Sequence, residues 1–230
     1  AKTGAILASG ASPSFDANKL NMQSYLNPLV SYAYEPGSTM KIFSFMTAID
    51  NDLYDGDETY MSGTIEVSDA TIKDFNNVGW GRISFDEGFN YSSNVAATIL
   101  SQRLGKDKLN EYYARFGFGT KTGITLPDEV NGSIKFNYPT EIATAAFGQG
   151  ITTTPIQNIQ ALTTIANDGV MLKPYIVSKI VDSNTKKVKY EAKREELGQV
   201  VKKSTTDKMK EMMHNVVTSG KTDARLFRSN

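Results

Sequence analysis

The segment from Gly37 to Ile49 limits most strongly how this chain can fold, because apolar side chains occur all round it when it is drawn as a helix. Such a pattern predicts a helix buried on every face, from Ser38 to about Asn51, rather than an amphipathic surface helix. Lys41 is the only charged residue of the segment. Burial of an ammonium group is costly and lowers the pKa of a lysine towards neutrality, which makes the amine a usable base.

Ser38 lies three residues before Lys41, on the same face of the predicted helix. A hydroxyl beside a desolvated amine is the arrangement of an activated nucleophile. The pattern S-x-x-K is weak alone, since roughly one chance match is expected in a chain of this length. Ser183 and Lys186 also match, in a segment that predicts a hairpin turn with solvated lysines. Burial therefore favours Ser38 and Lys41, and the alternative of a helix-capping serine with a snorkelling lysine stays open.

Composition excludes several kinds of site. The 230 residues carry a formal net charge of zero and no basic cluster, which argues against a nucleic-acid partner. The chain contains no cysteine, so it has no disulfide framework and no thiolate metal site. His214 is the single histidine, which rules out a multi-histidine metal site and a Ser-His-Asp triad elsewhere. We therefore predict no metal and no cofactor, and one core within a chain of this size.

Periodicity and breakers predict helices bracketed by strands without a β-α-β rhythm, which indicates an α+β fold. The expected elements are a strand over 4–9, helices over about 94–104 and 106–116 separated by Gly105, a helix from Thr154-Pro155 to about Asn167, a hairpin within 175–191 and an amphipathic helix over about 205–217. No apolar run approaches the ~20 residues that span a bilayer.

Ser92, Ser93 and Asn94 form a second candidate group. Alone, Ser-Ser-Asn before a helix is most simply a helix cap. Beside Ser38 and Lys41 it suggests a cleft, in which Ser92 would pass a proton between Lys41 and a leaving group. Asn94 would then hold the lysine and a substrate amide.

The run from Glu35 to Lys41 followed by Tyr91-Ser92-Ser93-Asn94 resembles the transpeptidase domain of class B penicillin-binding proteins, whose signatures include S-x-x-K. Further matches follow in the order of that family and cover nearly the whole chain: 3–9 with 13–16, 116–119 with 122–124, 126–129, 147–150, 154–157 and 166–170. The resemblance implies a penicillin-binding or serine β-lactamase-like fold, with an antiparallel sheet and a largely helical subdomain. We expect residues 1–230 to be one such domain, truncated at both ends.

The third element of the family, Lys-Thr/Ser-Gly on a strand beside the nucleophile, has no good match. Lys2-Thr3-Gly4 and Lys121-Thr122-Gly123 are literal matches at positions where the family makes no catalytic use of them. Lys221-Thr222-Asp223 comes nearest in chain order, but Asp223 stands where a glycine lets substrate approach the backbone. We therefore expect the chain to stop before the true motif.

The resemblance implies a serine D,D-transpeptidase that cross-links peptidoglycan stem peptides ending in D-Ala-D-Ala. Ser38 would be the nucleophile, acylated also by β-lactams, Lys41 its base, Ser92 the proton relay and Asn94 a holder of lysine and substrate. The implied partners are stem peptides, β-lactams and other cell-wall synthesis proteins, at the extracytoplasmic face of a membrane that anchors the parent protein. With one oxyanion donor of the usual two, the fragment alone is predicted to be inactive.

Two alternatives stay open. A serine β-lactamase or β-lactam sensor would share the Ser38–Lys41 pair, but the sequence offers no candidate base for hydrolysing the acyl-enzyme. A non-catalytic interaction domain is the other alternative.

Overall fold

The helix that was predicted to be buried lies at the centre of the fold. The computed structural model describes residues 2–12, 14, 16, 18–19, 22 and 24–219. Helix α2 spans Met40–Asp50 and continues from a short 3-10 turn, η1 (Gly37–Thr39). Nine of the eleven side chains of α2 are buried, and the helix packs against α4 and α7. The prediction for this segment is confirmed, with the first turn wound more tightly than an α-helix.

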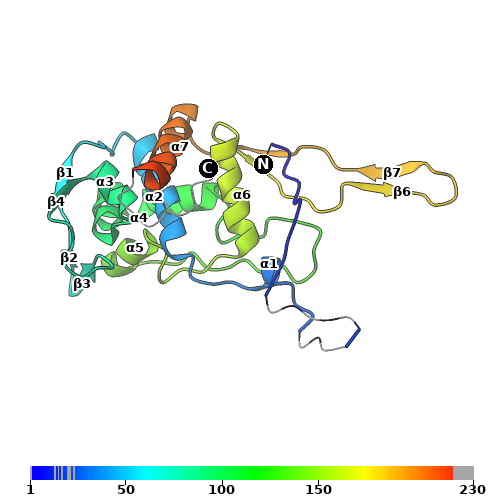
Figure 1. Cartoon of the computed structure of the whole chain (residues 1–230), viewed down its shortest axis with the longest axis horizontal. Helices are drawn as coiled ribbons and strands as arrows, with labels where there is room; N and C mark the ends of the chain where they lie inside the picture. The colour runs from blue at the N-terminus through cyan, green and yellow to red at the C-terminus, as the bar shows by residue number, and fades with distance from the viewer. Residues whose placement is uncertain are drawn as a thin grey trace.

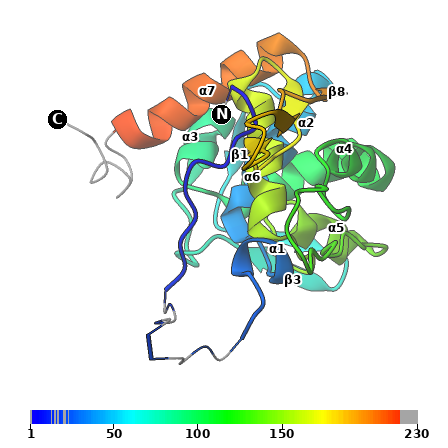
Figure 2. The same ribbon diagram turned by 90° about the vertical axis from the view of Figure 1, so that its right-hand side faces the viewer.

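The other helices surround α2 (Figures 1 and 2). Figure 2 shows α7 across the top of the molecule and α4 and α5 to one side. Their bounds are α1 (Pro28–Ser31), α3 (Phe85–Asn90), α4 (Asn94–Arg115), α5 (Pro139–Ala145), α6 (Pro155–Ala166) and α7 (Lys203–Thr218). The short helix α3 was missed, although Ser84 and Glu87 form a capping box that the sequence already contained.

The strands pair in twos, and every pair is antiparallel. The pairs are β1 (Thr59–Met61) with β4 (Arg82–Ser84), β2 (Thr64–Val67) with β3 (Ala70–Lys73), β5 (Val170–Leu172) with β8 (Glu196–Gln199), and β6 (Lys179–Val181) with β7 (Val188–Glu191). Helices and antiparallel strands in this order confirm the α+β class.

Local signals fixed two further helices. Gly105 has φ 72° and ψ 168°, so it interrupts α4 where two separate helices were predicted. At the start of α6, the Thr154 hydroxyl accepts from the Gln157 N–H at 3.3 Å and the Gln157 side chain accepts from the Thr154 N–H at 2.9 Å. This capping box confirms the predicted start of the helix at Thr154-Pro155.

The strand expected over 4–9 is wrong as a regular element. Ala5 forms one isolated parallel bridge to Tyr175, in which the Ile6 N–H donates to the Tyr175 carbonyl at 2.9 Å. A strand needs a partner over several residues, and one bridge is all that the described part of this segment finds. The matched run 13–16 includes Pro13 and Phe15, which lie outside the described residues.

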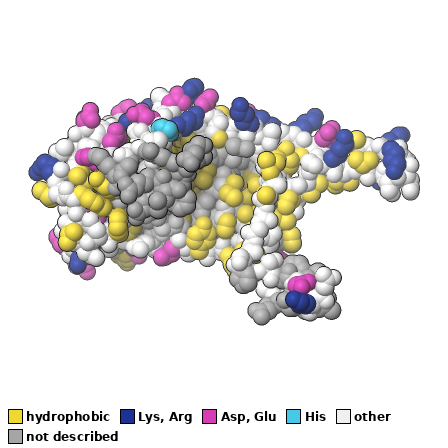
Figure 3. Space-filling model, in the orientation of Figure 1, with side chains coloured by type: hydrophobic (Ala, Val, Ile, Leu, Met, Phe, Trp, Pro, Cys, Tyr) yellow, Lys and Arg dark blue, Asp and Glu magenta, His cyan; other side chains and the backbone are white. Residues whose placement is uncertain are grey.

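The turn signals around 182–186 predicted a hairpin, and β6–β7 confirms it. The hairpin projects from the body as an arm (Figure 1). Hydrophobic side chains and basic side chains (Lys or Arg) both line the arm in the space-filling view (Figure 3). Ile180 pairs with Tyr190, and both side chains are exposed. Ser183 and Lys186, the second S-x-x-K match, are exposed on its turn.

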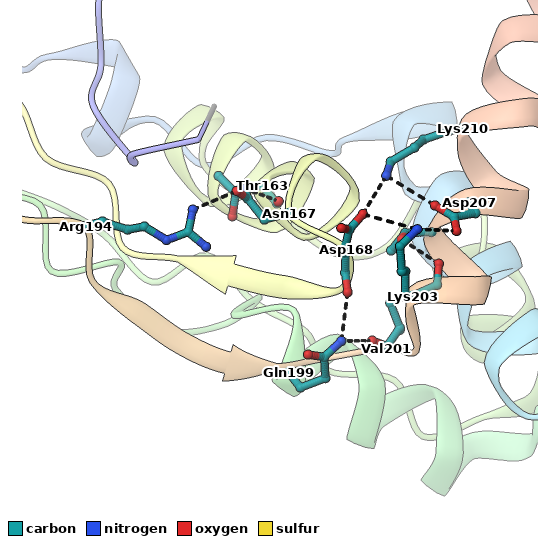
Figure 4. Close-up of polar contacts among 10 residues, drawn as sticks. Thr163, Asn167, Asp168, Arg194, Gln199, Val201, Lys203, Asp207 and Lys210 are labelled. Atoms are coloured by element: carbon teal, nitrogen blue, oxygen red, sulfur yellow. Dashed lines mark hydrogen bonds and ion pairs between the residues drawn. The ribbon is translucent and has the colours of Figure 1, made fainter.

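Helix α7 is held to the end of α6 by a polar cluster (Figure 4). The carboxylate of Asp168 accepts from Lys210 at 3.0 Å and forms an ion pair with Lys203 at 3.8 Å. The Gln199 amide donates to the backbone carbonyls of Asp168 and Val201 at 2.9 and 2.6 Å. These contacts fix α7, on which His214 is exposed. Among the described helices, none is long and apolar enough to cross a membrane.

Candidate active site

Ser38 lies in η1, at the N-terminal end of the buried helix α2. The Thr39 hydroxyl donates to the Pro36 carbonyl at 2.7 Å, and the Met40 N–H donates back to Gly37 and Ser38. The side chain of Ser38 is exposed, whereas the helix that follows is buried. Backbone N–H groups in a first helical turn lack intrahelical partners, so they are available to a developing negative charge.

Lys41 places its amine between two serine hydroxyls. Its Nζ donates to Ser38 Oγ at 3.1 Å, to Ser92 Oγ at 2.9 Å and to the Ser92 carbonyl. The residue is 3% exposed. Burial lowers the pKa of Lys41 to about 8, and the negative charge of Asp74 offsets part of that effect. The prediction of a desolvated lysine beside Ser38 is therefore met in both geometry and the direction of the pKa.

This arrangement suits a base. A charged ammonium has three N–H donors, and each has a partner here. In the neutral form two N–H groups can keep the contacts with Ser92. The lone pair is then free to accept the proton of the Ser38 hydroxyl, 3.1 Å away.

Ser92 adopts a backbone conformation that is uncommon outside glycine, with φ 56°. The turn is fixed by hydrogen bonds from the Ser92 N–H to the Phe89 carbonyl at 3.0 Å and from the Ser93 N–H to the Gly88 carbonyl at 2.8 Å. Strained residues of this kind persist only where the surroundings determine them, and they cluster at functional sites. Here the strain directs both the hydroxyl and the carbonyl of Ser92 to Lys41.

Asn94 is the first residue of α4, next to this turn, and is half-buried. Its side-chain amide donates to the Lys73 carbonyl at 2.8 Å. Within the described residues it makes no hydrogen bond to Lys41, so the predicted hold on the lysine is not seen in this state. Its predicted contact with a substrate amide stays a prediction, as do the catalytic roles of Ser38, Lys41 and Ser92.

Asp74 was missed by the sequence reasoning. Its carboxylate is 1% exposed and accepts from the Ser93 hydroxyl at 2.8 Å, the Val95 N–H at 3.1 Å and the Gly63 N–H at 2.8 Å. In a stretch rich in Asp, Asn and Gly such a residue resembles an ordinary turn aspartate. Nothing local in the sequence distinguishes it.

Aromatic side chains lie next to the turn that carries Ser92. Trp80 stacks on Tyr91, with ring centroids 4.7 Å apart and 9° between the planes. Phe75 lies 5.6 Å from Trp80 and is 70% exposed.

The two Lys-Thr-Gly matches that lie in the described residues form hydrogen bonds away from the Ser38–Lys41 site. The backbone and hydroxyl of Thr122 donate to Glu129 Oε1 at 2.7 and 2.6 Å, and the Gly123 N–H donates to Oε2 at 3.1 Å. The Gly4 carbonyl accepts from the Tyr175 N–H at 3.0 Å. Neither match is hydrogen-bonded to Ser38 or Lys41, and Lys221-Thr222-Asp223 lies outside the described residues. No cluster of three or more histidine or acidic side chains that could hold a metal occurs in the described part of the chain.

Comparison with known proteins gives consistent matches along the chain. A family model described as the penicillin binding protein transpeptidase domain matches residues 1–229. Stage V sporulation protein D of Bacillus subtilis is 34% identical over 228 residues, which are 95% of this chain and 35% of that protein. A probable peptidoglycan D,D-transpeptidase PenA of Neisseria flavescens is 28% identical over 228 residues, 96% of this chain and 54% of that protein. The chain thus spans between a third and about half of these relatives.

Solved structures agree with the sequence matches. Penicillin binding protein 2X from Streptococcus thermophilus superposes with a TM-score of 0.86 at 34% identity, over 92% of this chain and 32% of that one. Penicillin binding protein 3 from Mycobacterium tuberculosis, solved in complex with ampicillin, superposes with a TM-score of 0.79 at 30% identity, over 90% of this chain and 46% of that one. The penicillin-binding fold expected from the sequence is thereby confirmed.

Proposed function

This chain belongs to the penicillin-binding protein transpeptidase family, and from that premise we propose that it carries the acylation site of a serine D,D-transpeptidase that cross-links peptidoglycan. The observation that carries the proposal is the position of Lys41 Nζ, 3.1 Å from Ser38 Oγ and 2.9 Å from Ser92 Oγ. A single amine is thereby in reach of both the proposed nucleophile and a second hydroxyl.

In the acylation step, Ser38 Oγ attacks the carbonyl carbon of the penultimate D-alanine of a stem peptide. The Ser38 O–H proton passes to neutral Lys41 as the new C–O bond forms. The C–N bond to the terminal D-alanine then breaks, and Ser92 delivers the proton from Lys41 to the departing amine. The products are an ester on Ser38 and free D-alanine, with the lysine neutral again.

In the second step, the amine of another stem peptide attacks the ester carbonyl. The new amide bond is the cross-link, the C–O bond to Ser38 breaks, and the proton of the incoming amine returns to Ser38 through Ser92 and Lys41. The tetrahedral intermediates need an oxyanion hole. The Ser38 N–H, in the first helical turn, is the donor that this site supplies.

The names of the relatives support the substrate. The Neisseria relative is called a probable peptidoglycan D,D-transpeptidase, and the Mycobacterium relative was solved with the β-lactam ampicillin. We extend both properties to this chain: stem peptides as substrates, and β-lactams as acylating inhibitors of Ser38. The proposal also places the protein outside the cell membrane, where stem peptides are cross-linked, among other cell-wall synthesis proteins.

Intact-protein mass spectrometry after incubation with benzylpenicillin tests the proposal. The protein at its full encoded length and the 230-residue chain should be compared, each with Ser38→Ala and with Ser183→Ala. The second variant is a matched control, because Ser183 has the same S-x-x-K spacing on the exposed arm. We expect a gain of one drug mass in the full-length protein, lost in Ser38→Ala and kept in Ser183→Ala.

The remaining outcomes separate the alternatives. Rapid hydrolysis of the drug would indicate a β-lactamase, and an equal adduct on Ser38→Ala would overturn the role of Ser38. A folded full-length protein that forms no adduct would leave only a binding role.

A further inference from the structure

We propose that Asp74 is a positioning residue of the acylation site, which fixes the turn that carries Ser92 and holds a negative charge against the Lys41 amine. The inference rests on the proposed function, because it concerns the same lysine and serines. It adds a residue from outside the three family signatures, whose side chain touches neither Ser38 nor Lys41 directly.

Three segments meet at the Asp74 carboxylate. Oδ1 accepts from the Ser93 hydroxyl at 2.8 Å and from the Val95 N–H at 3.1 Å, and Oδ2 accepts from the Gly63 N–H at 2.8 Å. These donors belong to the turn beside Lys41, to the first turn of α4 and to the residue before β2. The Asp74 N–H also donates to the Gly63 carbonyl at 2.9 Å, which fixes the backbone from which the carboxylate extends.

The turn at Ser92 and Ser93, which these hydrogen bonds flank, is the one with the uncommon backbone conformation. Ser93 is fully buried, and its hydroxyl both donates to Asp74 and accepts from the Ala96 N–H at 3.1 Å. Ser92 immediately before it has φ 56° and directs its hydroxyl and carbonyl to Lys41. An uncommon backbone conformation persists only when neighbouring groups enforce it. The hydrogen bond from the Ser93 hydroxyl to Asp74 therefore helps to hold the adjacent Ser92 in place.

The charge of Asp74 is the second part of the argument. A carboxylate that is 1% exposed is expensive to bury, and a neutral side chain of similar shape would cap α4 at lower cost. Its field favours the protonated form of Lys41 and so limits how far burial lowers the pKa of the amine. Asp74 therefore raises the pH at which the neutral amine of Lys41 becomes available, against the larger effect of burial.

Other titratable groups around the amine do not take this role. Burial raises the pKa of Tyr60, which lies in β1, and that of Tyr113, which contacts α2 through Ser44, so both stay neutral while Lys41 titrates. Lys73 and Glu87 lie on the elements that flank the turn, but among the described residues Asp74 is the charge that acts on Lys41.

The test is the pH dependence of the acylation rate with a chromogenic β-lactam, measured on the full-length protein. Asp74→Asn should lower the plateau rate by about 10²-fold, the cost of slightly misplacing a catalytic group. It should also move the midpoint of the rise to lower pH by about one unit, the lower end of what a nearby opposite charge produces. Ser93→Ala loosens the turn but keeps the charge, so its plateau should fall while its midpoint stays with that of the wild type.

Asp69→Asn is the matched charge control, because Asp69 is exposed between β2 and β3 of the same hairpin and is screened by solvent. It should change neither plateau nor midpoint. An unmoved midpoint in Asp74→Asn would overturn the electrostatic role, and an unchanged plateau would overturn the positioning role. If wild type itself does not acylate, the proposed function fails instead.

Thermal denaturation shows whether each variant is folded. If Asp74→Asn does not fold, Asp74→Ser, which removes the carboxylate and leaves room for water, carries the same measurement with the same expected shift. Failure of both to fold, while Ser93→Ala folds, would assign Asp74 a purely structural role and overturn the inference.

Discussion

The backbones of Gly37 and Gly148 lie directly against each other, one residue before the proposed nucleophile. The Gly37 N–H donates to the Gly148 carbonyl at 3.0 Å. A Cβ atom on Gly148 would meet the Gly37 carbonyl oxygen at 2.1 Å and its nitrogen at 2.5 Å. The position of Ser38 therefore depends on a glycine 110 residues later in the chain.

Gly148→Ala should displace η1 and with it the Ser38 hydroxyl. We expect acylation by benzylpenicillin to slow by about 10²-fold, the usual effect of a misplacement near 1 Å. Gly150→Ala is the control for backbone strain, because Gly150 has a similar φ of 75° but a Cβ atom there would lie 3.5 Å from the Thr144 hydroxyl. Equal rates in the two variants, measured by stopped-flow acylation, would show that the close approach is unimportant.

Acylation should rise with pH through the titration of Lys41. Its pKa of about 8 means that the neutral amine is a minor form at pH 7 and the major form above pH 9. The rate of adduct formation in the wild type, measured from pH 6 to 9.5, should follow this rise. A rate independent of pH over the range would contradict a base at Lys41.

The same pKa predicts how stability changes with pH. Folding lowers the pKa of Lys41 from 10.5 to about 8, so the unfolded state binds more protons between these values. The lysine therefore costs stability most below pH 8, and the cost disappears as pH rises to 10.5. The free energy of unfolding of Lys41→Met and of the wild type should be compared by urea denaturation. The difference should favour the variant most at pH 7 and should shift in favour of the wild type by pH 10. A difference that does not vary with pH would contradict this.

The parts of the fold that depend on local chemistry could be predicted from the sequence. The apolar surroundings of Lys41 indicated the central helix, Gly105 the break in α4, and Thr154 with Pro155 the start of α6. Each signal lies within one or two turns of its effect. Propensity, capping and periodicity act over that distance.

Long-range pairs could not be derived in this way. Lys41 and Ser92 are 51 residues apart, so residue types suggested a shared cleft and the family resemblance supported it, but neither specified their hydrogen bond. Asp74 lies 19 residues before Ser93, its hydrogen-bond partner, and belongs to none of the recognised signatures, so neither route found it. The strand expected over 4–9 failed for the same reason, because a strand depends on a partner that its own residues do not specify.

Asp50 joins the end of α2 to the start of α7, and its replacement should destabilise the protein. It accepts from the Tyr112 hydroxyl at 2.7 Å, the Lys202 N–H at 2.8 Å and the Thr205 hydroxyl at 2.7 Å. Asp50→Asn removes a buried acceptor and should cost about 1–3 kcal/mol in the free energy of unfolding at pH 7. Asp52→Asn, at a side chain 90% exposed, is the control and should change little.

The stability difference between the wild type and Asp50→Asn should depend on pH. Burial alone raises the pKa of Asp50, but the hydrogen bonds from Tyr112, Lys202 and Thr205 and the charge of Lys202 bring it below its usual value. The stabilisation is thus complete above about pH 4 and is lost as pH falls through the folded pKa. Urea titrations at pH 7 and pH 3 should show the gap between wild type and Asp50→Asn narrowing in acid. A constant gap would mean that the carboxylate charge is not involved.

The stack of Trp80 on Tyr91 should be visible in solution, because Trp80 is the single tryptophan of the chain. Tyr91 immediately precedes Ser92, so loss of its ring frees both the tryptophan and the strained turn. Tyr91→Ala should shift the Trp80 emission and slow acylation about tenfold, since an aromatic pair contributes about 0.5–1.5 kcal/mol. Tyr91→Phe keeps the ring and should leave both measurements near the wild type. If Tyr91→Ala changes the emission but not the acylation rate, the stack lines the cleft without supporting Ser92.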